Sequence, residues 1–111
     1  MQVSIDTSGT YAVARLEGAL GQEDLDSLMT ELLPLVDQPK SQLIVDLSRV
    51  DTIDSSGLNV LINLVIRSRL HEGRVILVGP NKFVSGVLEL TQLDRWFEIC
   101  STADEAVQQL A

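Results

Sequence analysis

The stretch Ile53-Asp54-Ser55-Ser56-Gly57-Leu58 decides the fold of this chain because it joins a strand pattern to a helix pattern. The segment Leu43-Ile44-Val45-Asp46-Leu47 before it is nearly all apolar, which is typical of a strand covered on both faces. Apolar residues recur at helical spacing after Gly57. A hydroxyl at the start of a helix can cap the helix, and it can also carry a phosphate at little electrostatic cost. The tandem serines Ser55 and Ser56 are therefore candidate switch residues.

Strand and helix patterns alternate along the rest of the chain. The first eighteen residues read as a β-hairpin, and later apolar runs are typical of buried strands. This alternation favours an α/β fold with a mixed, largely parallel sheet of four or five strands and helices packed on it. The length fits one domain over residues 1–111. We expect strands at 2–6, 11–18, 43–47, 75–78 and 96–100, and helices at 22–36, 55–71, 81–90 and 103–110.

Proline, glycine and hydroxyl residues predict where the helices begin and end. Pro34 would disrupt a helix interior, so we expect the first helix to end or kink near it. Gly73 is the expected C-terminal cap of the long helix that follows the two serines. Ser101 or Thr102 is expected to cap the last helix, because acidic residues follow in its first turn.

The composition limits the partners that the protein can bind. Sixteen acidic against eight basic residues give a net charge of −8, which argues against nucleic acid and anionic membrane surfaces. The charge favours a partner with a basic or neutral face, although solubility alone would also explain it. The apolar segment 58–66 is too short to insert into a membrane, and the N-terminus lacks a signal-peptide pattern. Because Cys100 is the single cysteine and has apolar neighbours, we expect a packing thiol and a cytoplasmic protein.

The sequence offers little support for catalysis or for a bound cofactor. His71, the only histidine, lies roughly 24 Å from Ser55 along a continuous helix, so a serine hydrolase is a distant third hypothesis. Glycine-rich phosphate loops are absent, and one cysteine with one histidine cannot build a zinc site. Asp54 lacks the companion acids and the lysine that a phospho-accepting aspartate needs. We therefore expect no enzyme activity, no cofactor and no metal.

The helix after the serines has two sets of apolar residues. A core stripe is expected from Leu58, Leu61, Ile62 and Val65. Val60 and Leu64 point partly to another side, beside Asn59 and Asn63. They either pack under neighbouring helices or form an exposed apolar patch, as a partner site would. Ser55 has a similar alternative, since it is either only a helix cap worth ~1 kcal/mol or the substrate of another protein.

The run from Leu43 to Leu58 resembles the core of STAS domains, specifically the bacterial anti-sigma factor antagonists, in which D-S-S-G-L or D-S-T-G-L follows an apolar strand. The resemblance covers nearly the whole chain, from the opening hairpin to the late segment Leu90-Thr91-Gln92-Leu93. It implies a single STAS domain without catalytic activity of its own. Such a domain acts as a protein-binding module in the regulation of transcription.

The resemblance also implies a phosphorylation switch. It gives Ser55 the role of phosphorylation site, with Ser56 as the alternative and Asp54 as a motif neighbour. The unphosphorylated form would bind an anti-sigma factor that is a serine kinase and so free the sigma factor, while a phosphoserine phosphatase would reset the phosphorylated form. We expect the partner-binding residues to be Asp24, Asp54, Ser55, Gly57, Asn59, Val60, Asn63 and Leu64.

One position departs from the family pattern. Family members often have G-x-L-D after the second strand, with an acid that helps to meet the kinase, whereas this chain has Gly18-Ala19-Leu20-Gly21. Glu23 or Asp24 could supply the acid from the start of the next helix. The departure keeps an alternative open, a non-switching STAS subunit of a membrane transport ATPase complex.

Overall fold

The computed structural model describes the backbone of residues 1–111 and the side chains of all residues except Ser8 and Asp24. Its elements follow the predicted order of strands and helices. The strands are β1 (Gln2–Ser8), β2 (Tyr11–Leu20), β3 (Gln42–Ile53), β4 (Arg74–Val78) and β5 (Glu98–Cys100). The helices are α1 (Leu25–Val36), α2 (Ser55–Leu70), α3 (Lys82–Leu90) and α4 (Ala103–Leu110), with single 3-10 turns η1 (Gln22–Asp24) and η2 (Leu93–Arg95).

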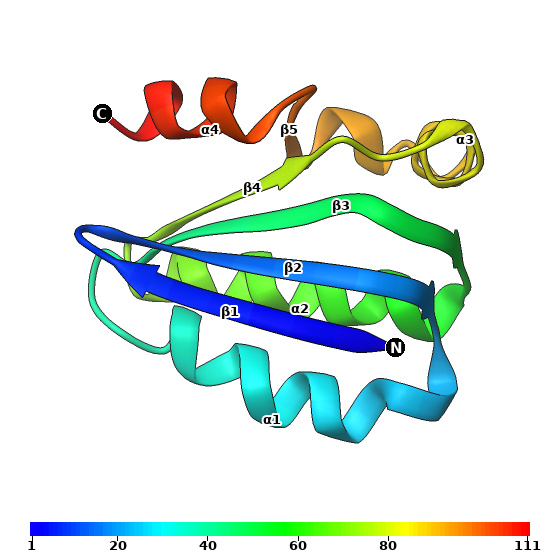
Figure 1. Cartoon of the computed structure of the whole chain (residues 1–111), viewed down its shortest axis with the longest axis horizontal. Coiled ribbons are helices and arrows are strands. Elements are labelled where there is room, and N and C mark those ends of the chain that lie inside the picture. The colour runs from blue at the N-terminus through cyan, green and yellow to red at the C-terminus, as the bar shows by residue number, and fades with distance from the viewer.

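The described backbone forms one five-stranded sheet in the order β1-β2-β3-β4-β5 (Figure 1). The β1–β2 pair is antiparallel and the other pairs are parallel, which confirms the predicted mixed, largely parallel α/β fold. Helices α1 and α2 lie side by side on one face, and α4 packs on the other face over β3 to β5 (Figure 1). Alternate residues of β3 serve the two layers, since Val45 enters the core with α1 and α2 while Ile44 packs with α4.

The parallel strands β2, β3 and β4 all end at one edge of the sheet, where η1, α2 and α3 begin (Figure 1). Asn81 ties two of these connections together. Its side chain caps α3 by accepting a hydrogen bond from the Val84 amide at 2.8 Å, and its Nδ2 donates to the carbonyl oxygens of Val50 (3.0 Å) and Asp51 (3.1 Å). In open sheets of this kind, ligands bind beyond the carboxyl ends of the strands. The candidate serines lie at this edge.

Strand β3 is longer than predicted. It continues past Leu47 to Ile53 beside β2, whereas its pairing with β4 stops at the Asp46–Val78 pair. The second half of β3 therefore has a strand on one side only, and residues such as Ser48, Arg49 and Thr52 are exposed. The prediction required a continuous apolar run and so ended the strand too early.

The helix ends agree in part with the predicted signals. Pro34 lies inside α1, which ends two residues later at Val36, near the proline as predicted. At the end of α2, Glu72 rather than Gly73 adopts the left-handed conformation, with φ of 59°. Gly73 is instead confined by packing, because a Cβ there would lie 2.6 Å from the Ser41 carbonyl oxygen.

Most of the apolar residues in the first three turns of α2 are buried, among them Val60 and Leu64. Val60 and Leu64 are both 0% exposed and belong to the main core with the stripe that includes Leu61. Because α1 packs along the flank of α2, the buried arc of α2 is wider than one stripe facing the sheet. The prediction of an exposed apolar patch at Val60 and Leu64 is therefore wrong, and the alternative that they pack under a neighbouring helix is correct.

Truncation of Leu64 tests this placement. We expect Leu64→Ala to lower the free energy of unfolding by about 2–5 kcal/mol, because it leaves a cavity in a closed core. The matched variant Asn63→Ala changes an exposed neighbour and should shift stability by no more than about 0.5 kcal/mol. Denaturant unfolding followed by circular dichroism measures both values. Equal effects of the two substitutions would contradict the burial of Leu64.

Candidate functional site

Helix α2 begins at Ser55, and its N-cap is Asp54. Asp54 has extended backbone angles, φ −109° and ψ −175°, and its Oδ1 accepts a hydrogen bond from the Gly57 amide at 2.9 Å. This contact satisfies one of the amides that a helix start leaves unpaired. The prediction that Ser55 lies within one residue of a helix start is confirmed, but its interpretation as the cap is wrong. Aspartate and serine are both strong caps, so residue type alone does not separate them.

The two serines differ in exposure. Ser55 is exposed, whereas Ser56 is partly buried. Since Asp54 provides the cap, the hydroxyl of Ser55 is not needed to complete the helix. Ser55 is therefore an exposed residue at the positive end of the α2 dipole, and the helix cap does not use its hydroxyl. This geometry favours Ser55 over Ser56 as a site that another protein can reach.

The end of β2 holds the start of α2 in place. The Asp54 amide donates to the Leu20 carbonyl oxygen at 3.2 Å, and the Gln22 amide donates to Asp54 Oδ2 at 3.3 Å. Asp54 thus contacts both its own helix and the turn that follows β2. These two hydrogen bonds join the end of β2 to the start of α2, and the one between Gln22 and Asp54 is exposed to solvent.

Two glycines make this close contact sterically feasible. A Cβ on Gly57 would lie 2.2 Å from the Leu20 carbonyl oxygen, and a Cβ on Gly21 would lie 2.5 Å from Asp54 Oδ2. Real Cβ atoms do not approach other atoms so closely. A side chain at position 57 would force the end of β2 and the helix start apart, whereas a side chain at position 21 would displace the Asp54 carboxylate. Gly57 therefore permits a tight turn into the helix, and the backbone of Leu20 is the reason that this position needs a glycine.

The exposed face of α2 starts at Ser55. Asn59 and Asn63 follow on the same face at helical spacing and are exposed, as the predicted site requires. Ile66 and Leu70 continue this face and are 43% and 74% exposed. Sequence reasoning missed both, although their spacing from the two asparagines indicates the shared face. The side chain of Asp24, the remaining predicted partner contact, lies outside the described part of the structure.

The sequence matches one known domain family over nearly its whole length. The model of the STAS domain matches residues 2–106. The chain belongs to the STAS domain family. This family is non-enzymatic, so the domain acts without catalysis of its own.

The relatives of this STAS domain include proposed anti-sigma factor antagonists. The proposed anti-sigma factor antagonist BtrV of Bordetella bronchiseptica is 26% identical over 106 residues, which cover 96% of this chain and 91% of BtrV. The crystal structure of a proposed anti-sigma factor antagonist from Thermotoga maritima, TM1081, has a TM-score of 0.84 and 27% identity, and the match covers 96% of this chain and 92% of TM1081.

The fold is also shared with SpoIIAA. The structure of this anti-sigma factor antagonist in its unphosphorylated form matches with a TM-score of 0.83 and 22% identity, over 98% of this chain and 96% of SpoIIAA. A structure of Bacillus SpoIIAA in the phosphorylated form matches with a TM-score of 0.75 and 19% identity, over 99% and 100%. The present chain is thus distantly related in sequence to BtrV and TM1081, and it shares its fold with SpoIIAA.

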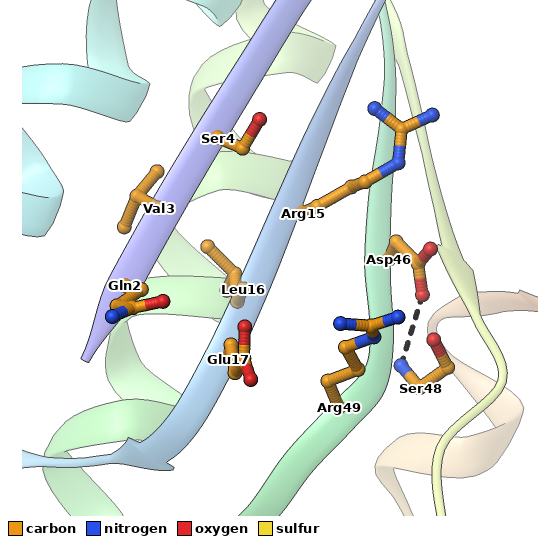
Figure 2. A pocket seen from close by; sticks show the side chains of 9 residues that line it. All are labelled: Gln2, Val3, Ser4, Arg15, Leu16, Glu17, Asp46, Ser48 and Arg49. Carbon is orange, nitrogen blue, oxygen red and sulfur yellow. Dashed lines mark hydrogen bonds between the residues drawn. The ribbon is translucent and has the colours of Figure 1, made fainter.

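A hollow of about 470 Å³ lies elsewhere on this STAS domain (Figure 2). It is formed by β1, β2 and β3 on the sheet face away from α2, and its described lining includes none of the residues from Asp54 to Leu58. Arg15 and Arg49 are balanced there by Glu17 and Asp46, so the hollow carries no net charge that would select a ligand. It does not contribute to the candidate site.

Two further sequence predictions concern the cysteine and the membrane. Cys100 is partly buried beside α4, and burial raises the pKa of its thiol, as expected for a packing rather than a reactive cysteine. Within the part of the chain that the structure describes, no helix is both long and apolar enough to cross a membrane.

The contact between Gly57 and Leu20 yields a testable difference between two helical glycines. We expect Gly57→Ala to lower the free energy of unfolding by about 1–3 kcal/mol, because the new methyl group meets a backbone carbonyl. The control is Gly86→Ala in α3, where no atom lies within 4 Å of the added Cβ. This change should raise stability by roughly 0.5–1 kcal/mol, since alanine is the better helix former. Thermal and denaturant unfolding would show opposite signs, and a stabilising Gly57→Ala would refute the proposed steric role.

Proposed function

We propose that this STAS domain is an anti-sigma factor antagonist controlled by phosphorylation of Ser55. In the unphosphorylated state it binds and sequesters a kinase-type anti-sigma factor, which frees the sigma factor for transcription. The observation that carries the proposal is the exposed Ser55 hydroxyl at the first position of α2, next to a helix cap supplied by Asp54. Because such a kinase uses ATP, the proposal also implies a cytoplasmic location.

The chemistry of the switch requires little from the domain itself. The Ser55 Oγ attacks the γ-phosphorus of ATP held by the kinase, its proton is taken up by the kinase or solvent, and ADP leaves. A phosphoserine phosphatase restores the hydroxyl by hydrolysis. The domain contributes an accessible nucleophile on a rigid helix start, and the catalytic groups belong to its partners.

The free energies favour a switch that leaves the fold intact. A phosphate adds about −1.5 to −2 charges. The N-terminus of α2 stabilises such a charge by about 0.3–1 kcal/mol, so the free domain tolerates it. If the same charge is desolvated and unpaired in a packed interface, it costs several kcal/mol. Since ~1.4 kcal/mol changes affinity tenfold, phosphorylation releases the partner.

The partner surface in this proposal is the exposed face of α2. It contains Ser55, Asn59 and Asn63, and Ile66 takes the apolar role that Val60 and Leu64 cannot fill from the core. Asp54 and Gly57 belong to the site because they hold the helix start against β2. Asp24, which precedes α1 at the same sheet edge, remains a proposed steering charge.

The relatives support this choice. SpoIIAA, whose fold the chain shares, exists in both a phosphorylated and an unphosphorylated form. BtrV, which aligns with almost the whole chain, is a proposed anti-sigma factor antagonist. The two forms of SpoIIAA and the proposed role of BtrV are both consistent with a serine that is exposed in the free domain beside a binding face.

Substitution of Ser55 tests the switch. We expect Ser55→Ala to keep binding the cognate kinase in the presence of ATP, whereas the wild-type domain is released as it becomes phosphorylated. Ser55→Asp should bind more weakly, because its charge enters the interface. Binding is measured by calorimetry with the purified kinase, and the phosphorylated residue is identified by mass spectrometry. Ser56→Ala is the control and should behave like the wild type. Phosphate on neither serine after incubation with the kinase and ATP would reject the proposal.

Truncation of Ile66 tests the binding face. We expect Ile66→Ala to weaken kinase binding about tenfold, because it removes an apolar contact of roughly 1.4 kcal/mol beside the polar part of the face. Its effect on stability should be small, since Ile66 is 43% exposed. Leu90→Ala is the matched control, an aliphatic residue that is 87% exposed on α3. Equal affinities for Ile66→Ala, Leu90→Ala and the wild type would show that the partner binds elsewhere.

A further inference from the structure

The carboxylate of Asp54 is bound by two different parts of the chain. Its Oδ1 accepts from the Gly57 amide within α2 at 2.9 Å, and its Oδ2 accepts from the Gln22 amide in the turn after β2 at 3.3 Å. The second bond is longer and solvent-exposed, so it is the weaker of the two. One side chain therefore connects the start of α2 with the turn that leads into α1.

We infer that phosphorylation of Ser55 acts through Asp54 to release the Gly21–Gln22 turn from the start of α2. The inference rests on the proposed function, because it requires Ser55 to carry a phosphate. Asp54 is a positioning residue in this arrangement, since it holds the turn without contacting the kinase chemistry.

Charge and hydrogen bonding give the mechanism. A phosphate on Ser55 lies one residue from the Asp54 carboxylate, so two anions compete at one helix start. Phosphate oxygens also accept hydrogen bonds from the same amides that Asp54 caps. Moving the carboxylate away from the phosphate first breaks the long bond from Gln22, because the Gly57 bond is shorter and better buried.

Gly21 makes the turn sensitive to this movement. A Cβ on Gly21 would lie 2.5 Å from Asp54 Oδ2, so the turn packs closely against the carboxylate and is affected by any movement of it. The turn continues into η1, which carries the exposed acid Glu23. Release of the turn therefore displaces an acidic segment at the same sheet edge as Ser55, in addition to the charge that the phosphate itself brings.

The test uses the domain alone, with phosphoserine placed at position 55 by codon reassignment. Solvent exchange of the Gln22 amide is measured by NMR in the modified and unmodified proteins. We expect exchange at Gln22 to become at least fivefold faster in the phosphoserine protein. The Val84 amide is the internal control, because the side chain of Asn81 caps it at 2.8 Å in the same way and this cap does not involve Asp54. Its exchange should not change.

The variant Asp54→Asn separates the two contacts of the carboxylate. Asparagine keeps an oxygen for the Gly57 amide and is an equally good helix cap, but its NH₂ group cannot accept from Gln22. We expect Asp54→Asn to speed Gln22 exchange without phosphate, and phosphoserine at 55 to add no further change in this background. The inference is overturned if phosphoserine leaves Gln22 exchange unchanged, or if its full effect persists in Asp54→Asn.

These outcomes are independent of the proposed function. Neither kinase nor anti-sigma factor is present in the exchange measurement, so a missing partner cannot produce a negative result. If phosphoserine at position 55 weakens kinase binding while Gln22 exchange stays constant, the switch is retained and the role of Asp54 is rejected. If Gln22 responds but no kinase binds the domain in either state, the proposed function fails and the local coupling stands.

Discussion

The contact between the Leu20 carbonyl and Gly57 is the constraint on which the rest of the site depends. Strands β2 and β3 are parallel and end at the same edge, so the chain that leaves β3 must start its helix beside the end of β2. Only a residue without a Cβ can pass that carbonyl at the observed distance. The hydrogen bond from the Asp54 amide to the same carbonyl then fixes the first turn of α2. The position of Ser55 is thus determined by the sheet and not by a mobile loop.

Two neighbouring residues of the motif have different roles, since Asp54 caps the helix and Ser55 is the proposed site of phosphorylation. If Ser55 were the cap, its oxygen would be occupied by a backbone amide, and a phosphate there would remove a contact that the helix needs. With Asp54 as the cap, the helix start is complete before Ser55 is reached. The serine hydroxyl is therefore available at little structural cost. An aspartate directly before the serine therefore suits the proposed cycle of phosphorylation and dephosphorylation at Ser55.

The sequence predicted the elements and their order because each strand and helix has its own periodic apolar pattern. It failed where the outcome depends on distant segments. The second half of β3 was missed because pairing with β2 alone leaves it polar, and pairing is not a local property. Val60 and Leu64 were placed in a possible surface patch because the second buried flank of α2 exists only through α1. The bond between Gln22 and Asp54 joins residues far apart in sequence, so no spacing rule indicates it.

The phosphate of the proposed switch has opposite consequences in the free domain and in the complex. In the free domain it lies at the positive end of a helix dipole and in contact with water, where its cost is small. In a complex the helix dipole is unchanged, but water is removed from the serine side of α2 and the charge must be met by the partner. A partner surface that is complementary to the neutral hydroxyl does not carry a cationic group opposite Ser55, so the charge of the phosphate stays unpaired there. In the proposed switch the domain is therefore released without unfolding, and most of the free energy of release comes from desolvation of the phosphate at the interface.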